Sequence, residues 1–217
     1  MTKRDEPTAS AILADRAALR RANRDLLWRD HGILRTFWTN FAPVAPQVYR
    51  SNHPPSARLD VYSDLGIRAI INLRGEPKKP FQMIEAERCA ELGIAFHSIA
   101  LNARQAPAPR RLLELFGLFD TVARPFLLHC KSGADRAGLA AALYLLDQGE
   151  SVATARRQLS WRYLHLAFTR TGIQDMFLDM YAERLAEGEI TIRDWIANEY
   201  DRDDLIARFG RKWILPL

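Results

Sequence analysis

Apolar and polar positions follow one another along this chain in blocks that predict strands and helices in turn. Short apolar runs predict buried strands at residues 47–50, 68–73, 95–99 and 126–129. Segments with helical apolar spacing lie between them and predict helices at residues 55–65, 81–92 and 109–122. This βαβαβ alternation predicts an α/β fold, in which helices cover both faces of a central, mainly parallel sheet of four to five strands.

The N-terminal segment carries a helical pattern of its own. Over residues 8–30, Ile12, Leu19 and Leu26 recur every seven residues, and arginines occupy much of the remaining surface. Such a helix could pack on the domain with its arginines in water, or it could rest on an anionic membrane surface.

Helical patterns also follow the last predicted strand. We expect helices at 137–148, 151–160 and 172–187, and Thr191 with Asp194 is typical of a capping box for another. The sequence therefore predicts three parts, which are an N-terminal helical extension (1–43), a main domain (44–187) and a C-terminal helical extension (188–217).

Composition and charge narrow the class of protein. The chain has 217 residues, 48% of them apolar, which is enough for one domain with a substantial core. Its net charge is +5, and residues 1–36 supply +3 of it, with eight Lys or Arg against five Asp or Glu. This charge attracts phosphorylated ligands and anionic surfaces in general, but it does not indicate nucleic-acid binding. We see no repeats and no zinc-ligand spacing.

The same composition predicts a cytoplasmic location. The longest apolar stretch, at residues 137–146, is too short to cross a bilayer, and the first residues show no apolar segment of a secretory signal. Two cysteines do not make a disulfide framework. The oligomeric state is not predicted by any of these patterns.

The most informative segment is His129–Arg136, which follows the apolar run at 126–129 and precedes a helical run. Five residues separate Cys130 from Arg136, and Gly133 is among them. A strand, a tight loop and a helix start in this order can aim several backbone N–H groups at one anion. Such surroundings can lower the pKa of a cysteine thiol from about 8.5 to roughly 3.5–7.5, which favours the thiolate.

These residue types suit transfer of a phosphoryl group. Cys130 would attack phosphorus, Arg136 would hold two phosphate oxygens in a bidentate grip, and Gly133 would let the backbone turn beside the anion. Water would then release phosphate. The loop and the arginine supply the positive charge, so no metal ion or other cofactor is expected.

With its flanks the segment resembles the signature loop, His-Cys-x-x-Gly-x-x-Arg, of the cysteine-dependent protein tyrosine phosphatase superfamily. The stretches 48–51, 65–74 and 96–99 extend this resemblance to the atypical dual-specificity phosphatases of bacteria, plants and fungi, over roughly residues 44–187. The resemblance implies that His129 supports the loop and that phosphate is bound by the loop residues Lys131, Ser132, Gly133, Ala134, Asp135 and Arg136.

Two departures from the family pattern concern catalysis. Ala137 stands where the superfamily usually has a Ser or Thr whose hydroxyl assists the cysteine as leaving group. Residues 98–109, where family members carry a general-acid aspartate, hold no Asp or Glu. Asp135 is the best replacement, as in the similar loop of the myotubularin phosphoinositide phosphatases. Alternatively it pairs with a basic neighbour, or the substrate has a leaving group that needs no acid.

Other polar residues are weaker candidates. Arg74 and Arg104 could contact substrate phosphate, or they could be ordinary surface arginines, Arg74 paired with Glu76. Lys131 could make the site more electropositive. Cys89 is expected to be a small buried residue, although a protective disulfide with Cys130 stays open. The remaining candidates are expected to be structural: His31, His53, His97, His165 and the stretch Trp161–Tyr163.

The sequence thus predicts a phosphomonoester hydrolase that works through a phospho-cysteine. The leading substrate is a phosphorylated protein side chain, including phosphotyrosine, and the competitor is a lipid or inositol head-group phosphate at an anionic membrane surface. A non-catalytic phosphate-binding module and a rhodanese-like sulfur carrier are the alternatives of other classes.

Overall fold

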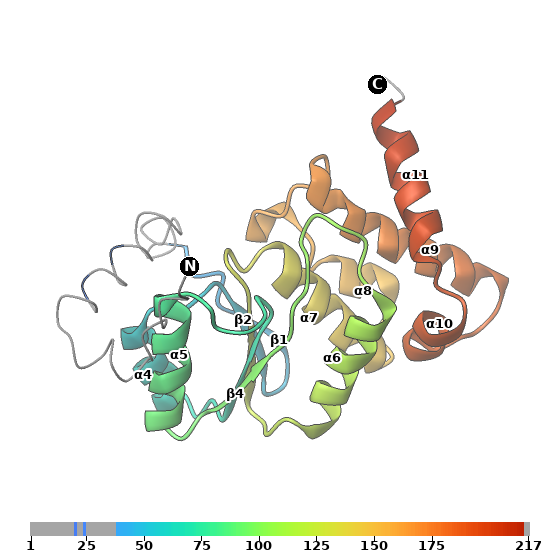
Figure 1. The fold of residues 1–217 in the computed structure, drawn as a ribbon. Coiled ribbons are helices and arrows are strands. Elements are labelled where there is room, and N and C mark those ends of the chain that lie inside the picture. The colour runs from blue at the N-terminus through green and yellow to red at the C-terminus, as the bar shows by residue number, and fades with distance from the viewer. Residues whose placement is uncertain (1–19, 21–23, 25–37, 215–217) are drawn as a thin grey trace, which may run out of the picture.

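A computed structural model of the chain, which describes Arg20, Arg24 and residues 38–214, is built on a central five-stranded sheet (Figure 1). The strands are β1 (Ala42–Ala45), β2 (Val48–Ser51), β3 (Ala69–Asn72), β4 (Ala95–Ser98) and β5 (Phe126–His129). They lie in the order β1-β2-β5-β3-β4. All neighbours run parallel except β1 and β2, so the predicted mainly parallel sheet is confirmed.

Strand β1 is the element of the sheet that the sequence did not predict. Its sequence, Ala-Pro-Val-Ala, is apolar, but Pro43 argues against a central strand; at the sheet edge Pro43 is exposed and the other three residues are half-buried. The strand predicted from Gln47 also begins one residue later. Gln47 takes a left-handed conformation (φ 62°) in the turn that joins β1 to β2.

Alternate residues of the inner strands point into two separate apolar layers. Ile70 of β3 and Leu127 of β5 pack with α4 (Ser56–Asp64) and α5 (Pro80–Glu91) on one face. Ile71 and Leu128, one residue further along each strand, join the larger core on the other face. That core includes α6 (Pro109–Thr121) and α7 (Asp135–Asp147). Figure 1 shows the two helical layers on opposite sides of the sheet.

Helix α7 is the most enclosed helix of the fold and follows the predicted signature loop directly. Every residue from Ala137 to Leu146 is buried. It packs on β5 and β2 on one side and on α8 (Val152–Arg156) and α10 (Ile192–Asn198) on the other. A short, uniformly apolar helix can be buried on all sides in this way.

The C-terminal helices are close to those predicted, with one exception. Helix α8 is shorter than the predicted 151–160, because the chain then forms 3₁₀ turns at Trp161–Tyr163 and Arg170–Gly172. After α9 (Ile173–Glu187), Thr191 Oγ1 accepts from the Asp194 backbone N–H at 3.0 Å, which confirms the predicted cap of α10. Helix α11 spans Arg202–Ile214.

Side chains of α10, among them Trp195, belong to the same core as β5 and α7. The three-part division of the chain stays a prediction, and most of the helix predicted over 8–30 lies outside the described residues. Within the described part of the chain, no helix is long and apolar enough to cross a membrane.

Candidate active site

The predicted signature loop lies at the C-terminal end of the central strand β5, where parallel sheets present their functional loops. Cys130 follows His129, the last residue of that strand, and α7 begins at Asp135. The Cys130 side chain is only 1% exposed, so the sulfur sits at the base of the loop.

Gly133 is required by the path of this loop. Its φ is +75°, and a Cβ at this position would lie 2.7 Å from the Asn52 backbone nitrogen and 2.8 Å from Asn40 Cβ. Both the backbone angle and the contact with the end of β2 therefore exclude a larger side chain.

Four successive carbonyl groups of the loop point toward β2 and the segments around it. The Lys131 carbonyl accepts from the His53 backbone N–H at 3.3 Å, and the Ser132 carbonyl accepts from Asn40 Nδ2 at 2.8 Å. The carbonyls of Gly133 and Ala134 accept from Arg50 Nη2 at 2.6 Å and 3.0 Å. In a trans peptide the N–H points opposite to the C=O. The N–H groups of residues 132–135 are therefore turned away from these partners, which is the arrangement of an anion-binding nest.

Arg50 is the buried centre of this support. Its side chain is fully buried in β2, and its Nη1 donates to the backbone carbonyl and side-chain Oε1 of Gln158 at 2.6 Å and 2.7 Å. The guanidinium carbon lies 3.8 Å from the centroid of the Tyr163 ring. Burial lowers the pKa of Arg50 to about 10, against the opposing influence of Tyr163, Cys130 and Asp135, so the group stays charged at neutral pH.

A second buried network holds the residue before the cysteine. Glu85 of α5 places one carboxylate oxygen 2.9 Å from His129 Nε2 and the other 3.2 Å from His53 Nδ1. Burial tends to raise the pKa of Glu85, but His129 and His53 outweigh it and the pKa is lowered. The ligand atoms of these three residues lie within 4.8 Å of one another and could together hold a metal ion. Glu85 already bridges both rings, however, so an ion-pair network accounts for the cluster.

Arg136 lies at the same edge of the sheet as Cys130. Its Nη1 is 3.5 Å from the carbonyl oxygen of Leu73, just beyond β3. Its Nε is buried and has no hydrogen-bond partner among the described residues. The guanidinium is therefore positioned beside the loop with donor capacity to spare.

Asp135, the proposed general acid, faces a buried histidine. Its Oδ1 lies 2.8 Å from His165 Nδ1, and the other ring nitrogen of His165 lies 2.7 Å from Asp175 Oδ2. The His165 side chain is fully buried, whereas that of Asp135 keeps 20% of its surface exposed. The basic neighbour that the sequence offered as an alternative partner for Asp135 is thus a histidine 30 residues away.

A cavity of about 330 Å³ opens beside Asp135 and unites two candidates from distant parts of the sequence. Arg104 reaches it from the segment after β4, and Arg170 reaches it from the turn before α9. Its full lining is Arg104, Asp135, Leu164, Leu166, Thr169, Arg170 and Thr171. Two guanidinium groups beside the loop favour an anionic ligand in this cavity.

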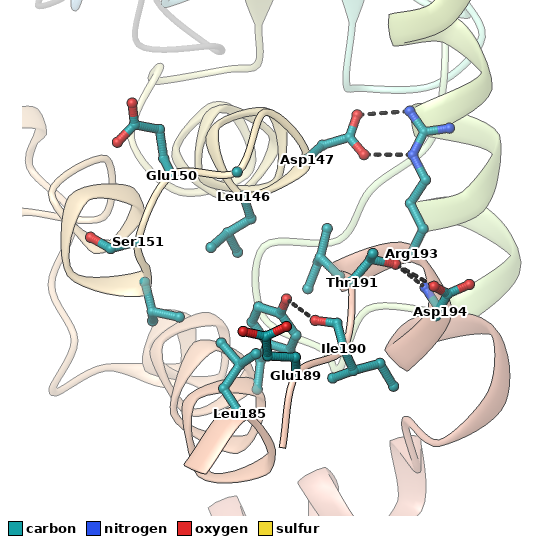
Figure 2. Close-up of a pocket in the computed structure, with 14 residues that line it drawn as sticks. Leu146, Asp147, Glu150, Ser151, Leu185, Glu189, Ile190, Thr191, Arg193 and Asp194 are labelled. Carbon is teal, nitrogen blue, oxygen red and sulfur yellow. Dashed lines mark hydrogen bonds and ion pairs between the residues drawn. The ribbon is translucent and has the colours of Figure 1, made fainter. Parts of the chain in front are cut away.

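A larger cavity of about 930 Å³ lies elsewhere, between the end of α7 and α9 and α10. Figure 2 shows Arg193 at its rim, paired with Asp147, and Thr191 beside Asp194. None of the residues of the signature loop lines it. Size alone therefore does not mark the catalytic cleft, and of these two cavities only the smaller one includes a loop residue, Asp135.

The other candidates have mixed positions. The Arg74 guanidinium carbon lies 5.2 Å from the centroid of the Phe81 ring, near the Glu85 network. Cys89 is a free thiol in the core layer of α4 and α5, whereas Cys130 belongs to the opposite layer. Burial raises the pKa of the Cys89 thiol. His97 is half-buried on β4, and His31 lies outside the described residues.

Trp161 and Tyr163 differ in burial, although they belong to one short stretch of the sequence. Tyr163 is buried under Arg50, but Trp161 is 79% exposed. Sequence reasoning missed the roles of Arg50, Glu85 and Asn40. The position of Arg50 could have indicated its role, because a charged residue inside a short buried strand needs buried hydrogen-bond partners.

Comparison with known proteins agrees with this geometry. The family model described as DSP-PTPase phosphatase fused to NAD+ kinase matches residues 46–172, which contain the whole signature loop. Among solved structures, the core catalytic domain of the PP-IP phosphatase Siw14 from S. cerevisiae, in complex with citrate, is 19% identical with a TM-score of 0.54. That match covers 68% of this chain and 91% of the yeast chain.

Two bacterial structures give similar values. A putative phosphatase from Shewanella putrefaciens is 19% identical with a TM-score of 0.54, covering 71% of this chain and 97% of that one. A Cys-to-Ser form of TpbA from P. aeruginosa, in complex with pTyr, is 20% identical with a TM-score of 0.52, covering 68% and 90%. At these identities the structural likeness shows a shared fold.

Proposed function

This chain belongs to the family of DSP-PTPase phosphatases fused to NAD+ kinase, and on that premise we propose that its phosphatase reaction takes place in the loop 129–136. Members of this superfamily hydrolyse phosphate esters through a cysteine and without a metal ion. In this chain Cys130 is the nucleophile, and Arg136 binds two oxygens of the transferred phosphoryl group. The catalytic domain spans residues 44–187.

The orientation of the loop carbonyls is the observation that carries this assignment. Because the carbonyls of residues 131–134 are bound by His53, Asn40 and Arg50, the N–H groups of residues 132–135 face away from these partners. The Ala134 N–H donates to Ser132 Oγ at 3.3 Å, and the N–H groups of residues 132, 133 and 135 can converge on an oxyanion. The same N–H groups would hold the oxygens of the phosphoryl group that Cys130 attacks. His129, held by Glu85, supports the end of β5.

The reaction has two steps, and Asp135 transfers a proton in each. In the first, a Cys130 sulfur–phosphorus bond forms, the ester P–O bond breaks, and the Asp135 carboxylic acid protonates the leaving oxygen. In the second, water attacks phosphorus, the S–P bond breaks to restore the thiolate, and the Asp135 carboxylate takes the water's proton. Ala137 offers no hydroxyl to the departing sulfur, which makes the second step the slower one.

A phosphorylated protein side chain, including phosphotyrosine, is the leading substrate. The buried position of Cys130 supports it, because a phosphate on a long aromatic side chain can reach the base of a deep loop. The complex of the similar TpbA with pTyr supports it by analogy of fold.

A lipid or inositol head-group phosphate is the second candidate. Arg104 and Arg170 flank the cavity beside Asp135, and polyanionic head groups would use both. Trp161 and Phe168 are 79% and 75% exposed in the connection between α8 and α9, which also supplies Leu164 and Thr169 to the cavity, and they would suit peripheral contact with an anionic membrane. The similar yeast Siw14 is described as a PP-IP phosphatase, which adds an analogy on this side.

Purified full-length protein tests these assignments directly. We expect turnover of an aryl phosphate and of a phosphotyrosine peptide, unaffected by a chelator, and loss of turnover in Cys130→Ser. Faster turnover of phosphoinositide vesicles than of the peptide would favour the head-group candidate. A wild type no faster than Cys130→Ser on all of these substrates would make the protein a non-catalytic phosphate-binding module.

A further inference from the structure

His165 occupies an unusual position for a residue outside the signature loop. It lies in the connection between α8 and α9, and its side chain is fully buried. Its two ring nitrogens lie 2.8 Å from Asp135 Oδ1 and 2.7 Å from Asp175 Oδ2. The ring therefore links the first residue of α7 to the first turn of α9.

Hydrogen-bond chemistry determines the charge of this ring. A neutral imidazole has one donor and one acceptor nitrogen, but both nitrogens here face carboxylate oxygens, which accept when ionised. Both contacts are satisfied together only when the ring carries two N–H groups and a positive charge. Burial opposes that charge, yet the hydrogen bonds to Asp135 and Asp175 outweigh it and raise the pKa of His165 to about 9.

The backbone around His165 is built to hold the ring in place. The His165 N–H donates to the Ser160 carbonyl at 3.2 Å, and the preceding Leu164 takes a left-handed conformation. Asn40, which also binds the signature loop, donates to the Tyr163 carbonyl at 2.9 Å. The segment that carries His165 is thus fixed to the same residue that fixes the loop.

We propose that His165 is a positioning residue for catalysis, a doubly protonated buried ring whose Nδ1–H holds Oδ1 of Asp135 and so orients Asp135 toward the cleft. The proposal rests on the proposed function, because it assumes that Asp135 transfers the proton. With Oδ1 held by His165, Oδ2 of Asp135 is the oxygen left to exchange a proton with the leaving group and with water. His165 keeps both of its own protons throughout.

Other charged groups also surround Asp135. Arg104 and Arg170 line the cavity beside it, Arg136 follows it in the chain, and Asp175 lies on the far side of His165. The hydrogen bond from His165 is the contact that fixes the orientation of the Asp135 carboxyl group.

The two ring contacts can be tested separately. The amide nitrogen of His165→Asn can take the place of Nδ1 and keep a donor for Asp135, whereas the amide nitrogen of His165→Gln can take the place of Nε2 and keep a donor for Asp175.

The experiment measures kcat and KM for an aryl phosphate with a poor leaving group, on full-length protein. His165→Gln keeps a donor for Asp175 but not for Asp135, so its kcat should fall about 10- to 100-fold with little change in KM. His165→Asn keeps the donor for Asp135 and should retain most of the wild-type kcat.

Controls separate this inference from the proposed function. His97→Asn, on β4, should leave kcat and KM unchanged. Cys130→Ser tests the nucleophile and Asp135→Asn tests the acid. If Asp135→Asn lowers kcat but His165→Gln keeps the wild-type kcat, His165 has no such role while the phosphatase assignment stands.

A direct reading of the ring completes the test and does not depend on any variant folding. Nitrogen NMR of the wild-type protein near neutral pH should show two protonated ring nitrogens for His165. A single protonated ring nitrogen would overturn the proposal.

Discussion

Arg50 Nη2 donates to the carbonyl of Gly133 at 2.6 Å, so a residue of β2 decides which way the phosphate loop faces. The same guanidinium binds Ala134 and Gln158 and is fully buried. The conformation of the cysteine loop therefore depends on the neighbouring strand β2 as well as on the loop's own sequence.

Replacing Arg50 tests this dependence. In Arg50→Lys a single ammonium cannot reach the carbonyls of Gly133, Ala134 and Gln158 together. We expect the free energy of unfolding to fall by about 2–4 kcal/mol and vanadate binding to weaken at least about tenfold. Urea unfolding and inhibition by vanadate measure the two effects.

The matched control is Arg88→Lys, at a partly exposed ion pair with Asp60 on α5 and α4. It should change neither vanadate binding nor the unfolding midpoint appreciably. Equal vanadate inhibition in Arg50→Lys and wild type would contradict the role given to Arg50.

Gly133→Ala tests the contact between the loop and β2. The added Cβ would lie 2.7 Å from the Asn52 nitrogen, in addition to the cost of φ +75°. We expect loss of phosphate binding and a fall in stability of about 2–4 kcal/mol. Calorimetry and phosphate titration measure both.

Gly66→Ala is its control, because Gly66 has nearly the same φ, +79°, but nothing within 4 Å of the added atom. It should cost about 1–2 kcal/mol for the backbone alone and leave activity intact. Similar losses of activity in both variants would show that steric contact at Gly133 is unimportant.

The charge on His165 predicts a stability change at alkaline pH. Its pKa is 6.5 in an ordinary environment and about 9 in the folded protein, so the folded state binds this proton more tightly. The resulting stabilisation is complete below pH 6.5 and is lost as the pH rises through 9. It corresponds to roughly 3 kcal/mol. Urea midpoints between pH 6 and 10 measure it, and in His165→Asn the decline over this range should be absent.

Ala137 predicts an unusual time course. Without a hydroxyl to assist the departing sulfur, the phospho-cysteine should accumulate, giving a burst of released alcohol followed by a slower steady state. Ala137→Ser should raise the steady-state rate severalfold and reduce the burst. Stopped-flow measurements with an aryl phosphate follow both phases, and a wild type without a burst would mean that phospho-enzyme breakdown is not limiting.

The sequence predicted those features of the fold that depend on residues close together along the chain. The strand 126–129 was predicted with its observed bounds, and the helices around it were placed within a few residues, because apolar period and Gly or Pro boundaries are local signals. The anion-binding geometry expected at residues 130–136 also follows from a strand, a glycine turn and a helix start.

What the sequence could not predict depends on residues brought together by the fold. Arg50 is 83 residues from Gly133, and His165 is 30 residues from Asp135. Asp135 was a candidate from its place in the loop, but nothing nearby in the sequence indicated the buried histidine behind it. Strand β1 was missed for a different reason, since Pro43 argues against a strand and is accommodated only because β1 lies at the sheet edge.

Glu85 and Arg50 approach the catalytic loop from opposite layers of the sandwich, one through His129 and the other through Gly133. Grafting the eight-residue loop into another scaffold would therefore not transfer its chemistry, because the parts that shape it belong to α5 and β2. An engineer who wishes to reuse this catalytic centre must carry both supports along with it.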